Sequence, residues 1–570
     1  MVKRCWPRSV RSQLKIVASG ISYNALHYML RGPRQGSGTH GAAVLGPASS
    51  RRGCMKRKSG CVLVSFLAVG LSAAMAVSVR GQKPRSSRVP RLTPAQRTAR
   101  YLRSISKQPE LMIPFFRRLP KGGDLHNHLS GAVYAETYIR WAAEAGDCVA
   151  RHSEKLYRPP CRAGDRLASQ AMSDSRFYTR LLDAWSMLGW HPAIESGHDH
   201  FFATFGKYSL AERGHLGGML AQVAERSARQ HLIYLELMDT LDRETAAQIG
   251  ERVPWTPDFA RMCRRLQRAG LARAASFAQA RIARGIARMR HDLVCGTPQA
   301  KPGCRVTVRF LYQAIRALPP GAVFAQFLTG FALARKNPRV VGLNLVAPED
   351  GYVALHDFML QMHMLQYLHR LYPGVKISLH AGELYPQLVR PRYLRDHIRD
   401  SIEIGHASRI GHGVDIMHER HPFQLLREMR RKNILVEICL TSNADILGIQ
   451  GPFHPLPIYL RYRVPVALAT DDQGVARSDI SRQFLRAELT YHLGYPVLKR
   501  MIRNSLDYAF IPGSSLWRAP EVFHPVAACA GGPLGARRPA PACAAFLKSS
   551  PKARLEWRLE RQLRAFEMKY

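Results

Sequence analysis

The stretch Ser378–Glu383, which reads SLHAGE, decides the fold, because an apolar run ends there in reactive side chains. The run from Val375 to Leu379 has the length and composition of a buried strand. His380 ends this predicted strand, and the carboxylate of Glu383 follows three residues later. Functional side chains of parallel barrels gather at such C-terminal strand ends. The stretch therefore predicts that His380 and Glu383 face the mouth of an α/β barrel.

Eight short apolar runs, separated by segments of helical length, follow one another along the chain. This alternation predicts an α/β fold, a (β/α)8 TIM barrel, over residues 122–510. The segment 140–230 is too long for one crossover and predicts a mainly helical insertion after the first strand. Residues 77–121 predict a linker and an N-terminal helix, and residues 511–570 predict a loop and a C-terminal helix. The predicted strands are 122–129, 232–238, 305–311, 340–346, 375–380, 409–412, 434–440 and 464–470.

The predicted insertion carries two patterns that have both a functional and a structural interpretation. Its aromatic residues, from Trp185 to Phe205, are interpreted as core rather than as a platform for a ligand. The triplet His198–His200, HDH, has the letters of a metal site but falls in a helical pattern. We interpret it as a solvated helix start.

Four side chains at the predicted strand ends match a metal site. His126 and His128 are two residues apart, and this spacing puts both on the same face of a strand. His380 ends the fifth run and Asp471 the eighth, and the first and eighth strands of a closed barrel are neighbours. Three imidazoles and one carboxylate are ligands that Zn²⁺ accepts. The sequence predicts one zinc ion per chain, bound by these four residues.

Three further polar residues are placed to act beside such a metal. Glu383 faces the same mouth without having to bind the metal, so it is placed to carry a proton to the substrate. His412 lies between two glycines and is placed to orient a water molecule. Asp472 follows Asp471 where the chain turns and is placed to contact the substrate. The predicted reaction is attack of water on an electron-poor carbon, with protonation of an adjacent nitrogen; the alternative is a chance scatter of polar residues in strands.

The chain is strongly basic, with 84 Lys and Arg against 41 Asp and Glu, a formal net charge of +43. Such a charge attracts anionic surfaces, and a solvated Arg-rich surface is the alternative interpretation. No basic and aromatic nucleic-acid motif stands out, so we expect no specific nucleic-acid partner. The sequence does not determine the oligomeric state.

The segment 55–76 has the parts of a secretory signal peptide: the basic start Lys56–Lys58, an uncharged apolar stretch, and the small-x-small end AMA. We expect export to the periplasm or outside the cell. The alternative is an uncleaved membrane anchor over residues 61–79. Residues 1–54 are basic and rich in Gly and Ser, and they predict a disordered arm or an over-extended start.

The cysteines agree with export. Of the 11 in the chain, six lie beyond the signal segment as close pairs in loop-like sequence. Close pairs in such loops suit disulfides in an oxidising compartment, and free thiols of a cytosolic protein are the alternative. The predicted bonds are Cys148–Cys161, Cys295–Cys304 and Cys529–Cys543.

These motifs, in this order, resemble the adenosine/AMP deaminase family of metal-dependent hydrolases. The signal segment, the insertion and the predicted disulfides are similar to the secreted or periplasmic, growth-factor-type branch of adenosine deaminases. The resemblance covers about residues 120 to 510. It is carried by DLHNHL at 124–129, HAGE at 380–383, RIGHG at 409–413, EICLTSN at 437–443 with His454-Pro455, and TDD at 470–472.

The resemblance implies zinc-dependent hydrolytic deamination of a small purine nucleoside, adenosine and also 2′-deoxyadenosine, to inosine and ammonia. It implies the four zinc ligands given above. It further implies that Glu383 protonates the purine ring nitrogen beside the attacked carbon, that His412 positions the hydroxide, and that Asp472 binds the imidazole part of the purine.

Three positions depart from the family pattern. Ser130 stands where an aspartate usually contacts the ribose, and Ala347 lies where a glycine backbone usually touches the purine. Gln473 replaces a common proline. Ser130 and Ala347 are therefore candidate substrate-binding positions, and another amino-purine, such as a modified adenosine or AMP, is the alternative substrate.

Two rivals belong to other functional classes. A two-metal amidohydrolase on the same barrel would normally need a bridging ligand, often a lysine at the end of strand four. The segment Asn344–Ala347 contains no lysine. A binding protein that keeps the fold is the second rival, and we regard binding as an added role because the predicted ligands and acid are all present.

Overall fold

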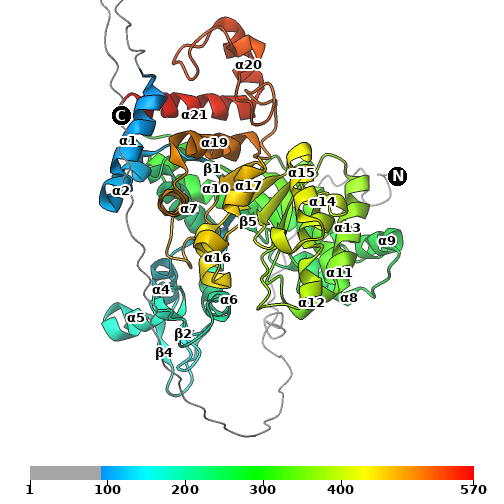
Figure 1. Ribbon diagram of the computed structural model, residues 1–570. Coiled ribbons are helices and arrows are strands. Elements are labelled where there is room, and N and C mark those ends of the chain that lie inside the picture. Colours follow the sequence, from blue (N-terminus) through cyan, green and yellow to red (C-terminus); the bar gives the residue numbers. More distant parts are fainter. Residues whose placement is uncertain (1–91) are drawn as a thin grey trace, which may run out of the picture. The chain divides into compact units, whose positions relative to one another are not determined.

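The computed structural model describes residues 92–570, and its central feature is one sheet of eight parallel strands (Figure 1). Each strand pairs with the next one along the chain, so the predicted eight-strand order is confirmed. The strands are β1 (Gly122–His128), β5 (Leu232–Asp239), β6 (Thr307–Ile315), β7 (Val340–Val346), β8 (Lys376–Ala381), β9 (Arg409–His412), β10 (Leu435–Ile438) and β11 (Val466–Leu468).

The first and last strands meet just beyond the end of β11. The backbone N–H of Asp471 donates to the carbonyl of His126 at 2.9 Å, and Asn127 and Asp471 form a parallel bridge. The Asp124 carboxylate accepts from the Thr470 hydroxyl at 2.5 Å and from the Asn127 amide at 3.1 Å. These contacts close the sheet into the predicted (β/α)8 barrel and bring the first and eighth strand ends together.

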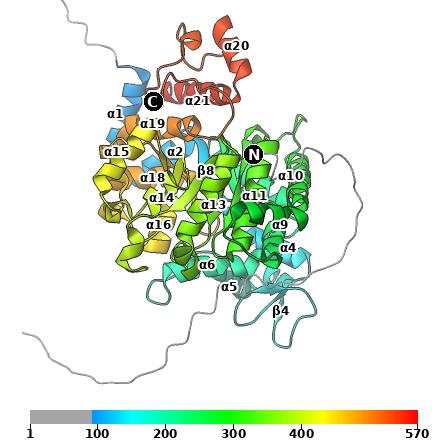
Figure 2. The same cartoon turned by 90° about the vertical axis from the view of Figure 1, so that its right-hand side faces the viewer.

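Helices cover the outside of the barrel between successive strands (Figures 1 and 2). Parallel strands need a crossover connection of a dozen or more residues, and this connection is usually an α-helix. The helices are α8 (Thr245–Arg252), α9 (Phe259–Arg268), α10 (Ala272–Asp292), α11 (Pro320–Lys336), α12 (Tyr352–His356), α13 (Phe358–Leu371), α14 (His397–Glu403), α15 (Pro422–Lys432), α16 (Leu440–Leu447), α17 (Leu456–Arg461), α18 (Ile480–Tyr491) and α19 (Gly494–Asp507).

Terminal helices extend the barrel, as predicted. α1 begins after Thr93, whose side chain accepts from the Gln96 backbone while the Gln96 side chain accepts from the Thr93 backbone. This reciprocal capping fixes the start of the helix. The elements are α1 (Pro94–Ile105), α2 (Pro109–Arg118), α20 (Pro541–Ser549) and α21 (Pro551–Glu567).

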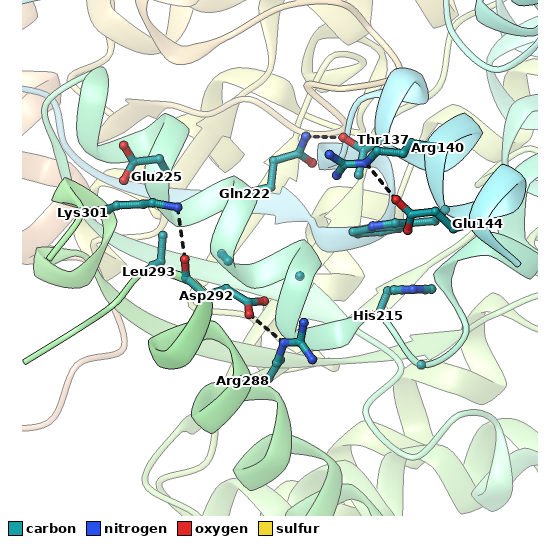
Figure 3. Close-up of a pocket in the computed structure, with 14 residues that line it drawn as sticks. Thr137, Arg140, Glu144, His215, Gln222, Glu225, Arg288, Asp292, Leu293 and Lys301 are labelled. Carbon is teal, nitrogen blue, oxygen red and sulfur yellow. Dashed lines mark hydrogen bonds and ion pairs between the residues drawn. The ribbon is translucent and has the colours of Figure 1, made fainter. Parts of the chain in front are cut away.

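The insertion between β1 and β5 contains helices and also a small antiparallel sheet of order β3-β2-β4, which the sequence interpretation missed. Strands of two residues carry no periodicity, so no pattern could reveal them. A cavity of about 610 Å³ lies where α4 and α7 meet α10 (Figure 3). The elements are α3 (Leu129–Ala132), α4 (Ala135–Glu144), β2 (Cys148–Val149), β3 (Leu156–Tyr157), β4 (Arg166–Leu167), α5 (Ser175–Ala184), α6 (Gly197–Tyr208) and α7 (Leu216–Arg229).

The triplet HDH does begin a helix, but the expectation that it is solvated is wrong for its histidines. Ser196 caps α6 by accepting from the backbone of Asp199. His198 bonds the Asp350 carboxylate, beyond β7, at 3.1 Å, and His200 bonds the carbonyl of Ser186 at 3.1 Å. The insertion is thus tied to a loop at the barrel mouth. Trp185 and Phe201 are buried, as predicted for core aromatics.

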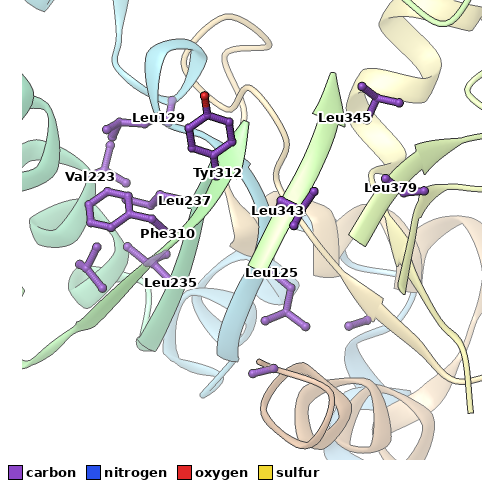
Figure 4. Packing of buried hydrophobic residues seen from close by; sticks show 14 of the residues in the cluster. Leu125, Leu129, Val223, Leu235, Leu237, Phe310, Tyr312, Leu343, Leu345 and Leu379 are labelled. Carbon is purple, nitrogen blue, oxygen red and sulfur yellow. The ribbon is translucent and has the colours of Figure 1, made fainter. Parts of the chain in front are cut away.

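The core follows from the alternation of side chains along the strands. Leu125 belongs to the main apolar cluster, whereas its neighbours Asp124 and His126 lie on the opposite face of β1. Figure 4 shows leucine and aromatic side chains from neighbouring strands packed together. Apolar packing on one face therefore holds the strands, and the polar residues on the other face are left for the barrel interior.

The three predicted disulfides are confirmed: Cys148–Cys161, Cys295–Cys304 and Cys529–Cys543.

Within residues 92–570, no helix combines the length and the apolar composition that a membrane span needs. The predicted arm 1–54, the signal segment 55–76 and the alternative anchor 61–79 lie outside the described residues.

Candidate active site and metal centre

Four predicted ligands converge at the C-terminal ends of β1, β8 and β11. The Nε2 atom of His380 lies 3.1 Å from the Nε2 atoms of both His126 and His128. The Oδ1 atom of Asp471 lies 3.4 Å from His126 Nε2 and 3.3 Å from His128 Nε2. Residues far apart in the sequence therefore present three imidazole nitrogens and one carboxylate oxygen to one point.

The outer nitrogen of each histidine is held by an acceptor. His126 Nδ1 lies 2.8 Å from a Glu437 oxygen, His128 Nδ1 3.0 Å from the Gln313 oxygen, and His380 Nδ1 2.8 Å from the Asn344 oxygen. Carboxylate and amide oxygens can only accept, so each Nδ1 carries a hydrogen, and Nε2 presents a lone pair whenever the ring is neutral.

This donor set fits a divalent cation. The Oδ1 atom of Asp471 is buried and has no hydrogen-bond donor among residues 92–570. Converging lone pairs and a buried carboxylate oxygen are satisfied together by a metal ion, and hydrogen-bonded outer nitrogens are usual for metal-binding histidines.

Burial decides the protonation of two of these imidazoles. It lowers the pKa of His128 to about 4 and the pKa of His380 well below its usual range, so both are neutral, as metal ligands must be. Burial also lowers the pKa of His126, but the carboxylates of Asp471 and Glu437 more than offset it and raise that pKa to about 10. A metal bound here would compete with this proton.

His412 lies beside the ligands but differs from them in its hydrogen bonds. The Asn443 amide donates to His412 Nδ1 at 2.9 Å, and His454 Nε2 donates to the Asn443 oxygen at 3.1 Å. The Leu456 backbone N–H in turn donates to His454 Nδ1 at 3.1 Å. This chain leaves the hydrogen of His412 on Nε2, which is buried and has no acceptor among the described residues. His412 thus offers a donor to the site.

The carboxyl groups of Glu383 and Asp472 are buried at the same mouth. Burial raises the pKa of Glu383 well above its usual range, and the nearby charges of Asp471 and Glu349 raise it further. Glu383 Oε1 lies 3.5 Å from His412 Nδ1. Burial and the charge of Asp471 likewise raise the pKa of Asp472. The raised pKa favours the protonated form of Glu383, which is the form that can donate a proton.

Two of the three departures from the family pattern, Ser130 and Ala347, also lie at strand ends. Ser130 belongs to α3, directly after β1, and its carbonyl accepts from the Tyr138 hydroxyl at 2.6 Å. Ala347 follows β7 with a φ of +88°, a conformation that favours glycine. The backbone thus keeps the shape that a glycine would adopt, although the residue is alanine.

Comparisons with known proteins give similarity to one family. The Adenosine deaminase family profile matches residues 278–516. This part of the barrel is similar to adenosine deaminases. Curated adenosine deaminases are similar to it: one from Clostridium perfringens is 26% identical over 182 residues, 32% of this chain and 51% of that protein. One from Mycobacteroides abscessus is 26% identical over 219 residues, 37% of this chain and 56% of that protein.

The chain spans about half the length of these curated relatives. Among solved structures, the Arabidopsis N6-mAMP deaminase is 19% identical with a TM-score of 0.46 and covers 70% of this chain and 96% of its own. An adenine deaminase from Arthrobacter aurescens is 15% identical with a TM-score of 0.43 and covers 69% of this chain and 94% of its own.

The site contains supporting residues to which the sequence analysis gave no role, although two of them are the ends of the quoted motif EICLTSN. Three are polar residues inside otherwise apolar strands, and that isolation is a signal that could have revealed them. Each of the four forms a hydrogen bond to the Nδ1 atom of a candidate ligand histidine or of His412. They are Gln313 in β6, Asn344 in β7, Glu437 in β10, and Asn443 in the loop helix α16.

Proposed function

We propose that the protein is a zinc-dependent hydrolase that deaminates adenosine, and also 2′-deoxyadenosine, to inosine and ammonia. The observation that carries the proposal is the convergence of four candidate ligand atoms beside the buried carboxyl group of Glu383, whose pKa is raised by burial. The family profile over residues 278–516 supports the reaction class.

His126, His128, His380 and Asp471 would hold the zinc ion, which would supply a Lewis acid that makes water nucleophilic near neutral pH. Water adds to the carbon that bears the amino group. Glu383 delivers its proton to the adjacent ring nitrogen, and its carboxylate takes up the proton that the water loses. Glu383 then passes this proton to the amino group, which leaves as ammonia, and recovers a proton from the added hydroxyl as the C=O bond forms. The Nε2 hydrogen of His412 orients the attacking oxygen.

Recognition of the purine falls to residues at the rim of the same site. Asp472 lies beside the ligand Asp471 and would bind the imidazole part of the base. Ser130 and Ala347 would face the sugar and the purine edge. Because Ser130 is shorter than the usual aspartate, a modified adenosine or AMP is the alternative substrate.

The first test follows ultraviolet absorbance after adenosine is added to the zinc-loaded full-length protein. We expect the spectrum to change from adenosine to inosine, and Glu383→Gln to reduce kcat by about 100-fold or more because the proton donor is lost. Glu560→Gln is the control, because Glu560 is a buried carboxylate that pairs with Arg503 in the C-terminal extension. Wild-type-like turnover in Glu383→Gln, or no turnover of any amino-purine, would contradict the proposal.

The two-metal rival has less support. A bridging ligand would have to come from the end of β7, where the polar side chain is Asn344. Its side-chain oxygen already accepts a hydrogen bond from His380. Metal analysis separates the two hypotheses, because the deaminase requires one zinc per chain and the rival requires two.

We also propose that the protein is exported. Support comes from the signal-like segment 55–76 and from the three disulfides, which persist in oxidising compartments. The mature N-terminus should then map near Val77, whereas an intact chain extracted from membranes would support the anchor. The charge of +43 supports binding to anionic surfaces as an added property.

A further inference from the structure

A buried polar cluster that the proposed chemistry does not use lies behind the turn that carries Glu383. Its members are Arg316, Glu349 and His397, and all three are at least nine-tenths buried. Arg316 directly follows β6, Glu349 follows β7 after the turn at Ala347, and His397 begins α14. Buried charges are costly unless they are paired, so their placement needs an explanation.

Glu349 binds the backbone of the turn directly. Its Oε2 accepts from the backbone N–H of Glu383 at 2.8 Å, and its Oε1 accepts from the backbone N–H of Gly382 at 3.1 Å. Gly382 has a φ of +74°, and this conformation belongs to a turn that only glycine adopts readily. A carboxylate has two oxygens and can satisfy both neighbouring N–H groups at once.

Glu349 is itself held from two sides. The Nδ1 of His397 donates to Oε1 at 2.6 Å, and the His397 ring stacks on Phe358 with 4.0 Å between ring centres. Arg316 places one guanidinium nitrogen 3.9 Å from Oε1. The other terminal nitrogen of Arg316 donates to the carbonyl of His380 at 2.8 Å. The cluster therefore holds both ends of the segment from the ligand His380 to the acid Glu383.

We infer that Glu349 is a positioning residue that holds the general acid Glu383 in place, with His397 and Arg316 as its supports. The inference rests on the proposed function. A general acid works only within hydrogen-bond reach of the atom that it protonates, and a misplacement of about 1 Å costs about 100-fold in rate. Because Glu349 touches the turn and not the substrate, its loss reduces kcat and leaves KM nearly unchanged.

Glu349→Gln tests the inference with little change in volume. A glutamine keeps one acceptor oxygen and places an amide nitrogen against the second backbone N–H, so the turn shifts. We expect kcat for adenosine to fall about 100-fold, KM to change by less than about 2-fold, and zinc per chain to stay at one. Glu560→Gln, which removes a buried carboxylate far along the chain, should retain wild-type kcat.

A double-mutant cycle separates positioning from general damage. If Glu349 acts through Glu383, the Glu349→Gln change should cost less than about 2-fold further in kcat when Glu383→Gln is already present. An equal loss in both backgrounds would overturn the inference. Wild-type turnover that survives Glu383→Gln would instead overturn the proposed function, so the two failures are distinguishable.

His397 provides a second route if Glu349→Gln does not fold. His397→Asn keeps a donor near the position of Nδ1, whereas His397→Phe keeps the stack on Phe358 and loses the donor. We expect the kcat of His397→Asn to stay within about 3-fold of wild type and the kcat of His397→Phe to fall by about 10-fold or more. Equal kcat values for the two variants would count against the inference.

Discussion

The proton on one imidazole is decided by residues that never touch the substrate. His412 receives a hydrogen bond from the Asn443 amide, and His454 fixes which way that amide points. Burial lowers the pKa of His454 to about 3, so it stays neutral and its Nε2–H keeps donating. The hydrogen of His412 is therefore directed into the site.

Asn443→Asp reverses this arrangement while it keeps the shape of the side chain. A carboxylate can only accept, so His412 would move its hydrogen to Nδ1 and present a lone pair to the attacking oxygen. We expect kcat for adenosine to fall by about 100-fold or more, because a wrong histidine tautomer is this costly in other hydrolases. Zinc content is measured in parallel. A variant with full zinc and wild-type kcat would show that the tautomer does not matter.

Gly131 makes room for Asp472. A Cβ at this position would lie 1.7 Å from Asp472 Oδ1, so Gly131→Ala must displace the carboxylate. We expect kcat/KM for adenosine to fall about 10-fold to 100-fold while zinc stays bound, because the proposed role of Asp472 is to bind the base and not the metal. Gly531→Ala is the matched control, since no atom lies within 4 Å of a Cβ there. An unchanged KM in Gly131→Ala would show that Asp472 does not bind the substrate.

The C-terminal helix α21 is held by a buried acid rather than by apolar contacts alone. The Glu556 carboxyl accepts from the backbone N–H of Leu516 at 2.6 Å and from the Ser515 hydroxyl at 3.2 Å. Burial, and after it the charge of Asp507, raise the pKa of Glu556 to about 7. The helix therefore has a stability that depends on pH.

The sign of this dependence follows from proton linkage. The folded chain binds a proton at Glu556 more tightly than the unfolded chain, whose pKa is near 4.5. The free energy of unfolding therefore falls as pH rises from about 4.5 to about 7, by about 3 kcal/mol at most. Glu556→Gln stays neutral and should remove this part of the slope. Denaturant melts at pH 5 and pH 8 measure it, and equal slopes in both proteins would refute the pKa shift.

Strands from three parts of the barrel meet at the candidate metal site. The ligands come from the first, fifth and eighth strands of the sheet, β1, β8 and the turn after β11. The bridge between Asn127 in β1 and Asp471, beyond the end of β11, is one of the contacts that close the sheet. A bound cation would therefore tie together the two strands at which the sheet closes.

Removal of the metal should destabilise the fold. A ligand present at about 100 times its Kd adds about 2.7 kcal/mol, which for a chain of this size is about 2–3 °C in Tm. We expect a chelator to lower Tm by this amount and one equivalent of zinc to restore it. His128→Ala should start from the lower Tm and respond less to the chelator. Identical melting with and without metal would place the ion elsewhere.

Much of the fold and of the site could be predicted from the sequence. Apolar runs of strand length alternate with helical segments, so the eight strands were readable within a few residues. The spacing of His126 and His128, and the strand ends at His380 and Asp471, were enough to group the ligands, because a barrel brings C-terminal strand ends to one mouth. The close cysteine pairs were also readable, because their short separations demand a local loop.

Only the tertiary structure decided which polar residues support these side chains. Glu437 is 311 residues from His126, and the partners of Glu349 lie beyond three different secondary-structure elements. Glu349 lies in a loop and His397 at the start of a short helix, so neither belongs to a periodic pattern, and a single buried polar residue in a strand looks like any other exception. The pattern of apolar and polar residues along the chain depends on whether each side chain faces the core or the solvent. Hydrogen-bond partners depend on how the barrel closes, and a local pattern contains no information about that closure.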